Sequence, residues 1–163
     1  MAMKLDLGGT ARCEDILFQN VDYLDVRAGE LKSRYSILVR SGRIAEISPD
    51  RIERAGAQVR DLKGRSVIPG LIDCHVHLMG EMLDASPKHL PSAQVLRASR
   101  RLFRMLQRGF TTVRDAGGAD SGFRAAVEAR VVPGPRVFVS GRALSQSGGH
   151  ADQRSLLSHA DLC

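Results

Sequence analysis

Two histidines separated by one residue stand in the segment VIPGLIDCHVHLMG, residues 67–80, and an aspartate precedes them at the same spacing. In an extended strand, side chains two residues apart point to the same side, so Asp73, His75 and His77 would share one face. Two imidazoles a few ångströms apart can bind a divalent cation, and a nearby carboxylate can orient them through a hydrogen bond. The spacing therefore indicates a candidate metal site with His75 and His77 as ligands and Asp73 as their supporting carboxylate.

A His-x-His pair also arises by chance, in which case the two side chains would be exposed or satisfied within a core. The position of this pair favours a ligand role, because it ends an apolar run that begins after Pro69-Gly70 and precedes a polar loop. Cys74 alternates with the histidines, so we expect it to pack under covering helices. The three cysteines of the chain are scattered without CxxC spacing, which favours reduced thiols over disulfides or a thiolate zinc site.

The elements that must position the pair change character at Pro69-Gly70. Before it, residues 15–68 have the pattern of short strands separated by turns, with Ser41-Gly42 at a tight hairpin and Lys63-Gly64 at another turn. After it, residues 71–76 form an apolar run without strict alternation, which is typical of a strand buried on both faces of a parallel sheet. The first part is therefore expected to be all-β, and the second to have parallel strands.

Helices and strands alternate beyond the histidine pair. We expect helices over residues 92–108 and 121–130, with strands at 110–118, running into a glycine loop, and at 136–141. In the first helix the side chains that share one face are Val95, Ser99, Leu102 and Leu106, and Gly109 is the natural terminator. This rhythm predicts a parallel α/β architecture, in which the chemistry lies at the carboxyl ends of the strands.

Other polar residues stand where these strands are expected to end. Asp115 could serve as a functional carboxylate, but an aspartate that caps the following glycine loop is the favoured interpretation. His150, in SGGHAD, is either a site residue or an exposed turn residue. Arg114 and Arg142 could contact an acidic substrate.

Composition excludes several classes of function. The net charge is +6, but acidic residues are interspersed among the basic ones, and the chain has five phenylalanines, two tyrosines and no tryptophan with which to stack on bases. The densest basic cluster fits a solvated helix face and consists of Arg97, Arg100, Arg101 and Arg104. No nucleic-acid partner is expected. No apolar run reaches the roughly 18 residues of a membrane span, and the N-terminus lacks a signal-peptide core, so we expect no membrane association and a cytoplasmic location.

Three segments together resemble a known family. VIPGLIDCHVHLMG, preceded by GRIAEI and DLKGRS, resembles the opening of the amidohydrolase superfamily of metal-dependent hydrolases. GFTTVRDAGG and GPRVFVSGRALSQSGGHAD resemble the branch that contains imidazolonepropionase-like enzymes and Xaa-Pro dipeptidases. The resemblance extends in order over residues 37–152.

The resemblance implies an α/β fold in which a (β/α)8 barrel is joined to a small β-sandwich. Residues 1–68 would form the N-terminal part of the sandwich and residues 69–163 the first part of the barrel. His75 and His77 would bind one or two divalent ions, with zinc favoured, and His150 would contact substrate at the barrel mouth. In the family, a metal-bound water attacks the carbonyl carbon of a cyclic amide or of a small amide such as a Xaa-Pro dipeptide.

The chain departs from this pattern in length and in its ligands. A complete barrel takes about 250 residues, whereas residues 69–163 suffice for about three βα units. The family's later ligands are a carboxylated lysine, two more histidines and an aspartate. After His77 no residue fits them, since none of Lys88, His89, His150, His159 and Asp161 ends an apolar strand. The sequence thus predicts an incomplete and inactive fragment whose full-length parent is a homo-oligomer. The alternative is a non-catalytic binding or assembly module derived from an amidohydrolase.

Overall fold

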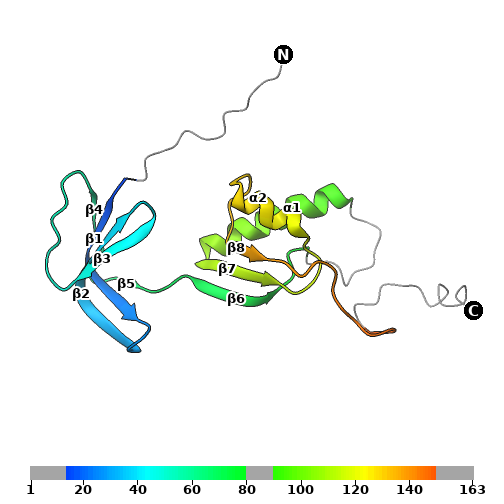
Figure 1. Ribbon diagram of the computed structural model, residues 1–163, viewed down its shortest axis with the longest axis horizontal. Helices are drawn as coiled ribbons and strands as arrows, with labels where there is room; N and C mark the ends of the chain where they lie inside the picture. Colours follow the sequence, from blue (N-terminus) through cyan, green and yellow to red (C-terminus); the bar gives the residue numbers. More distant parts are fainter. Residues whose placement is uncertain (1–13, 80–89, 150–163) are drawn as a thin grey trace, which may run out of the picture. The chain divides into compact units, whose positions relative to one another are not determined.

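The computed structural model describes residues 14–79 and 90–149. The chain divides into two compact units, Met1–Pro69 and Gly70–Cys163. Figure 1 shows the elements of each unit. No helix in the described residues has the length and apolar character that a membrane crossing requires.

The first unit is built from strands alone in its described part, as the sequence predicted. Its strands are β1 (Ile16–Asp25), β2 (Glu30–Arg40), β3 (Arg43–Ser48), β4 (Gln58–Asp61) and β5 (Ser66–Val67). β2 pairs antiparallel with both β1 and β3, whereas β4 and β5 each run parallel to β1. A small core between them contains the buried side chains of Leu17, Leu38 and Ile52.

Two turns of this unit use left-handed backbone. Ser41 and Gly42 have φ values of 50° and 73° and join Arg40 to its antiparallel partner Arg43, so the predicted hairpin is confirmed. Lys63 and Gly64 also have positive φ, 52° and 76°. Here, however, β4 and β5 follow one another along the same edge of β1, so this turn interrupts one edge and does not join a hairpin.

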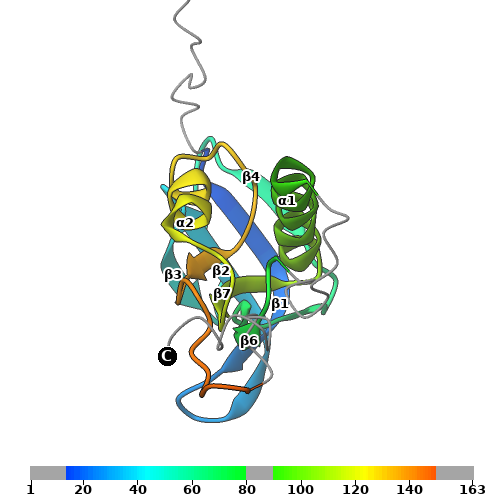
Figure 2. The ribbon, with the colours of Figure 1, turned by 90° about the vertical axis from the view of Figure 1, so that its right-hand side faces the viewer.

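The second unit alternates strands and helices, and its order is β6 (Leu71–Val76), α1 (Pro91–Gln107), β7 (Phe110–Asp115), α2 (Ser121–Glu128) and β8 (Arg136–Phe138). The sheet has the order β6-β7-β8, and both pairs are parallel. Figures 1 and 2 show α1 and α2 on the same face of this sheet. The predicted α/β character is confirmed, and α2 and β8 are shorter than the sequence suggested.

The core of the second unit lies between this sheet and the two helices. Each strand contributes one buried valine, and the helices contribute small and large apolar side chains; the main members are Val76, Val113, Val137, Ala98, Leu102 and Phe123. Because the helices of the described residues cover one face only, apolar side chains elsewhere on the sheet stay exposed, including Phe138 at 51%.

Helix α1 begins and ends close to the predicted positions, and its predicted face is buried only in part. Its end is fixed by Gly109, whose φ is +91° and whose N–H donates to the Leu106 carbonyl at 3.0 Å. Ala98 and Leu102 are buried, while Val95 and Leu106 are 45% and 38% exposed, so the predicted face was right at Leu102 and wrong at its two ends.

The prediction that residues 71–76 are buried on both faces is wrong for this structure. Leu71 and Ile72 are 42% and 66% exposed, and of the strand only Val76 is buried. The reason is that β6 lies at the edge of the sheet, where a strand has one neighbour and the described helices reach only part of one face. Cys74 is likewise exposed, which corrects the expectation that it packs under helices.

Candidate functional site

The carboxyl ends of β6 and β7 lie side by side. Val76, the last residue of β6, is in register with Asp115, the last residue of β7, and the Ala116 N–H donates to the Val76 carbonyl at 2.9 Å. The loops that follow the two strands therefore start at the same edge of the sheet. This edge carries His77 on one loop and Gly117 on the other.

The structure brings the two predicted imidazoles together. The ring centroids of His75 and His77 are 5.2 Å apart, their planes are inclined at 75°, and both residues are exposed. The strand is not regular between them and Asp73, because the register with β7 shifts between Asp73 and Val76. The same-face argument from strict alternation therefore does not hold across this shift, although the two rings still meet.

Asp73 supports the backbone of the pair. Its Oδ1 accepts a hydrogen bond from the His75 backbone N–H at 3.0 Å. In the described part of the chain this carboxylate makes no hydrogen bond to either imidazole ring. Asp73 thus contacts the backbone of His75 and neither imidazole ring, which differs from the expectation that it orients a ring.

His77 has a defined ring orientation. Its Nδ1 lies 3.0 Å from the Gly117 carbonyl oxygen. Because a carbonyl can only accept, Nδ1 must carry the proton of this hydrogen bond, and in the neutral ring Nε2 then keeps the lone pair. A backbone carbonyl that fixes the tautomer in this way is the usual outer partner of a metal-binding histidine.

Asp115 is completely buried and holds both loops. Its Oδ1 accepts hydrogen bonds from the N–H groups of Gly117 (2.9 Å) and Ala119 (3.1 Å), and its Oδ2 accepts one from Leu78 N–H (2.6 Å). The contacts to Gly117 and Ala119 agree with the interpretation of Asp115 as the cap of the glycine loop. The bond to Leu78 was missed, since a link between residues 37 positions apart leaves no local pattern.

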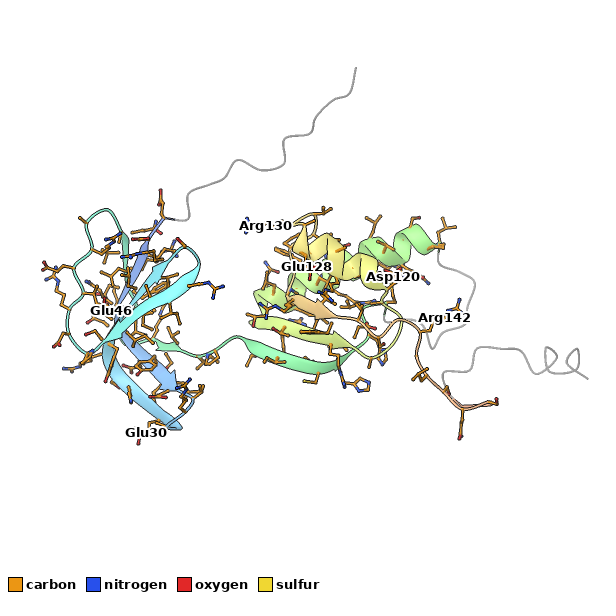
Figure 3. The ribbon with its side chains drawn as sticks, viewed as in Figure 1. Glu30, Glu46, Asp120, Glu128, Arg130 and Arg142 are labelled. Atoms are coloured by element: carbon orange, nitrogen blue, oxygen red, sulfur yellow. The ribbon has the colours of Figure 1, made fainter. Side chains whose placement is uncertain are left out.

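Two arginines also bind this edge through backbone carbonyls. Arg101 of α1 donates from Nη1 to the Leu78 carbonyl at 2.7 Å, so this helix residue, expected on a solvated face, is partly buried against the loop. Arg114 donates from Nε to the Cys74 carbonyl at 2.6 Å. Arg142 is exposed and lies on the segment after β8 (Figure 3).

The described residues do not bring together a full set of metal ligands. Within residues 14–79 and 90–149, no group of three or more His, Cys, Asp and Glu side chains is placed to hold a metal ion. His150 lies outside the described residues, as do Lys88, His89, His159 and Asp161. What the structure brings together is a pair of imidazoles, one of them with a fixed tautomer.

Comparison with known proteins places these motifs in a family. The model of the amidohydrolase family matches residues 66–161. Ochratoxinase of Aspergillus niger is 35% identical over 92 residues, which are 53% of this chain and 19% of that protein. Imidazolonepropionase of Klebsiella pneumoniae is 51% identical over 49 residues, 30% of this chain and 12% of the enzyme.

Solved structures give the same result over a longer stretch. The crystal structure of an amidohydrolase is 47% identical in sequence, with a TM-score of 0.79. The match covers 86% of this chain and 35% of the amidohydrolase chain. A prolidase complexed with N-methylphosphonate-L-proline is 38% identical, with a TM-score of 0.77 and coverages of 87% and 35%. A Xaa-Pro dipeptidase with bound methionine is 27% identical, with a TM-score of 0.75 and coverages of 88% and 38%.

The chain therefore spans just over a third of the length of these solved proteins. Its likeness to imidazolonepropionase and to Xaa-Pro dipeptidases confirms the resemblance drawn from its three motifs. Since the family model covers more than half of the sequence, the protein belongs to the amidohydrolase family.

Proposed function

We propose that this chain is the N-terminal portion of a metal-dependent amidohydrolase that hydrolyses a C–N bond in a small-molecule amide. The proposal is supported above all by the two imidazoles whose centroids lie 5.2 Å apart at the carboxyl edge of a parallel sheet. The relatives suggest the substrate class, because they include a prolidase, a Xaa-Pro dipeptidase and an imidazolonepropionase. A Xaa-Pro type dipeptide or a cyclic amide is the substrate we propose.

His75 and His77 are the proposed metal ligands. Imidazole nitrogens are good donors for zinc, and Nε2 of His77 is the nitrogen that its bond to Gly117 leaves available. A divalent metal held there would supply an acidified water and a Lewis acid for the substrate carbonyl. The protein's own contribution at this edge is orientation, since Gly117 fixes one ring and Asp73 fixes the backbone of His75.

Two imidazoles alone make a weak site, because affinity and geometry depend on the full ligand set. We therefore propose that the chain by itself is hydrolytically inactive and that the missing ligands come from protein beyond this sequence. Residues 1–68 would be part of a β-sandwich and residues 69–163 the first three or so βα units of a (β/α)8 barrel. In this arrangement the uncovered sheet face is the barrel interior, and His150 contacts substrate at its mouth.

Zinc binding followed by NMR tests the ligand assignment. In the chain labelled at its histidine rings, we expect zinc to shift the resonances of His75 and His77 together, with weak and exchangeable binding. His75→Ala or His77→Ala should remove the response of the remaining ring, whereas His89→Ala is the control and should leave both responses unchanged. Equal shifts across all five histidines, or unchanged shifts in the alanine variants, would contradict the assignment.

Activity tests the proposal that the site is incomplete. The chain should not hydrolyse a panel of Xaa-Pro dipeptides and lactams with zinc or manganese present. A product of the extended downstream reading frame should hydrolyse one of them and form a homo-oligomer in the cytoplasm. Metal-dependent hydrolysis by the chain alone would refute incompleteness. If the downstream reading frame encodes no lysine, histidines and aspartate at the ends of later strands, the alternative of a non-catalytic binding or assembly module would be favoured.

A further inference from the structure

We infer that Asp115 is a positioning residue for His77: its buried carboxylate sets the orientation of the His77 imidazole by fixing the loop that receives the ring. This inference rests on the proposed function in treating His77 as a metal ligand. It assigns to Asp115 a role that is not contact with the metal or the substrate. The two carboxylate oxygens of Asp115 hold backbone N–H groups on both loops beside the His77 ring.

The two oxygens of Asp115 divide their contacts between the two strand ends. Oδ1 accepts from the N–H groups of Gly117 and Ala119, at 2.9 and 3.1 Å, on the loop after β7. Oδ2 accepts from the Leu78 N–H, at 2.6 Å, on the loop after β6. A single carboxylate, with a relative exposure of 0%, therefore connects the loops that flank the candidate site.

Both attachment points adjoin the His77 ring. Leu78 is the next residue after His77, so its bonded N–H fixes the peptide that carries the imidazole. On the other loop, the Gly117 carbonyl that accepts the Nδ1 proton lies between the two N–H groups held by Oδ1. The ring is thus held from its own backbone and from its hydrogen-bond acceptor, and Asp115 is bonded to both.

The surrounding contacts leave this arrangement little freedom. A Cβ atom on Gly117 would lie 2.6 Å from the Cβ of Ala143, so this loop packs tightly against the segment after β8. On the other side, the Leu78 carbonyl is held by Arg101 of α1 at 2.7 Å. The loops cannot easily find replacement partners if the carboxylate is lost, because neighbours already occupy the space around them.

Asp115→Asn in the full chain is the test, read out on the His77 ring nitrogens. The amide retains one acceptor oxygen but presents an NH2 group where Leu78 N–H needs an acceptor. In the unsubstituted chain we expect ring ¹⁵N shifts of a protonated Nδ1 and an unprotonated Nε2. In Asp115→Asn we expect a mixture of tautomers and a loss of about tenfold in zinc affinity, which is typical when the outer partner of a ligand histidine is disturbed.

Asp120→Asn is the matched control. Asp120 also accepts a backbone N–H bond, from Gly122 at 2.9 Å, but it is exposed and caps α2 without contacting His77. This variant should leave the tautomer and the zinc affinity unchanged. If Asp115→Asn lowers only the unfolding midpoint, while the tautomer and zinc affinity stay as in the unsubstituted chain, Asp115 is merely structural and the inference is overturned.

A second measurement needs no change at Asp115 and covers the case in which that variant does not fold. Zinc should shift the amide resonances of Leu78, Gly117 and Ala119 in the unsubstituted chain but not in His77→Ala, with the Gly122 amide as an unaffected reference. Zinc shifts of the His77 ring without these amide shifts would overturn the inference. If zinc binds nowhere near His77, the proposed function fails, and the tautomer comparison still decides the role of Asp115.

Discussion

Truncation of Leu102 to alanine should destabilise the second unit by about 2 to 3 kcal/mol. Leu102 is 1% exposed and lies in the core between α1 and the sheet. Leucine-to-alanine changes in cores cost about 2 to 5 kcal/mol, depending on how far the site can collapse. Leu102 also borders a groove of about 180 Å³ between α1 and α2, so the space left by its side chain would open toward solvent. For that reason we place the loss of unfolding free energy in the lower half of the range.

Leu96 offers a control within the same helix. Its side chain is 71% exposed, so Leu96→Ala removes the same atoms without emptying a packed site. Both variants gain the same small increase in helix propensity, which cancels in the comparison. The free energy of unfolding of Leu96→Ala should therefore stay within about 0.5 kcal/mol of the unsubstituted chain.

The chain provides separate probes for its two units. It has no tryptophan, and its two tyrosines, Tyr23 and Tyr35, lie in the first unit. Both helices of the described residues lie in the second unit. In urea titrations, far-UV ellipticity should therefore follow the second unit and tyrosine fluorescence the first.

Leu102→Ala should lower the midpoint of the ellipticity transition and leave the fluorescence transition in place. Equal shifts in Leu102→Ala and Leu96→Ala would refute the packing of α1 through Ala98 and Leu102. A shift of both probes in Leu102→Ala would show that the two units unfold together, against the expectation that they unfold independently.

Two further predictions concern a close contact and an ion pair. Gly70→Ala should lower the ellipticity midpoint by the equivalent of about 1 to 3 kcal/mol, because the new Cβ atom would overlap the Thr111 side chain. Adding Thr111→Gly to the Gly70→Ala chain should recover part of this loss. The second concerns pH: the hydrogen bond from Lys32 Nζ, at 2.8 Å, and that from the Ala28 N–H lower the pKa of Asp25 in the folded state. A lowered pKa stabilises the first unit above the unfolded pKa of Asp25, and this contribution is lost as pH falls through the folded value. The urea midpoint followed by tyrosine fluorescence should accordingly decrease at acid pH, and Lys32→Met should make the decrease shallower; an unchanged acid slope in that variant would contradict the role of the ion pair.

The turns, the end of α1 and the direction of the strands in the second unit could be predicted, because each depends on residues close together in the sequence. Ser41-Gly42 specifies a two-residue turn through its left-handed backbone, and Gly109 ends α1 for the same reason. The alternation of strand and helix after Pro69 predicted parallel pairing, since a helix between two strands brings the second strand back in the same direction.

Burial could not be predicted as well, because it depends on which elements are present to cover a strand. The apolar run of β6 is typical of a strand enclosed on both faces, yet Ile72 is 66% exposed where the described residues supply helices on one face only. The face of α1 was misjudged for a related reason. Hydrophobicity alone did not favour Ala98, which is nevertheless one of the two buried residues of the helix.

The chemistry of the candidate site could also be predicted only in part from the sequence. Spacing alone brought His75 and His77 into proximity, but it could not decide which ring nitrogen is free to bind a metal. That choice depends on the Gly117 carbonyl, 40 residues away in sequence, and on the buried carboxylate of Asp115 that fixes the loop around it. The segment RDAGG is thus as much a part of the candidate site as DCHVH, because its backbone fixes the ring of His77, the proposed ligand. A change in this glycine loop should therefore alter metal binding at His77 even when both histidines are intact.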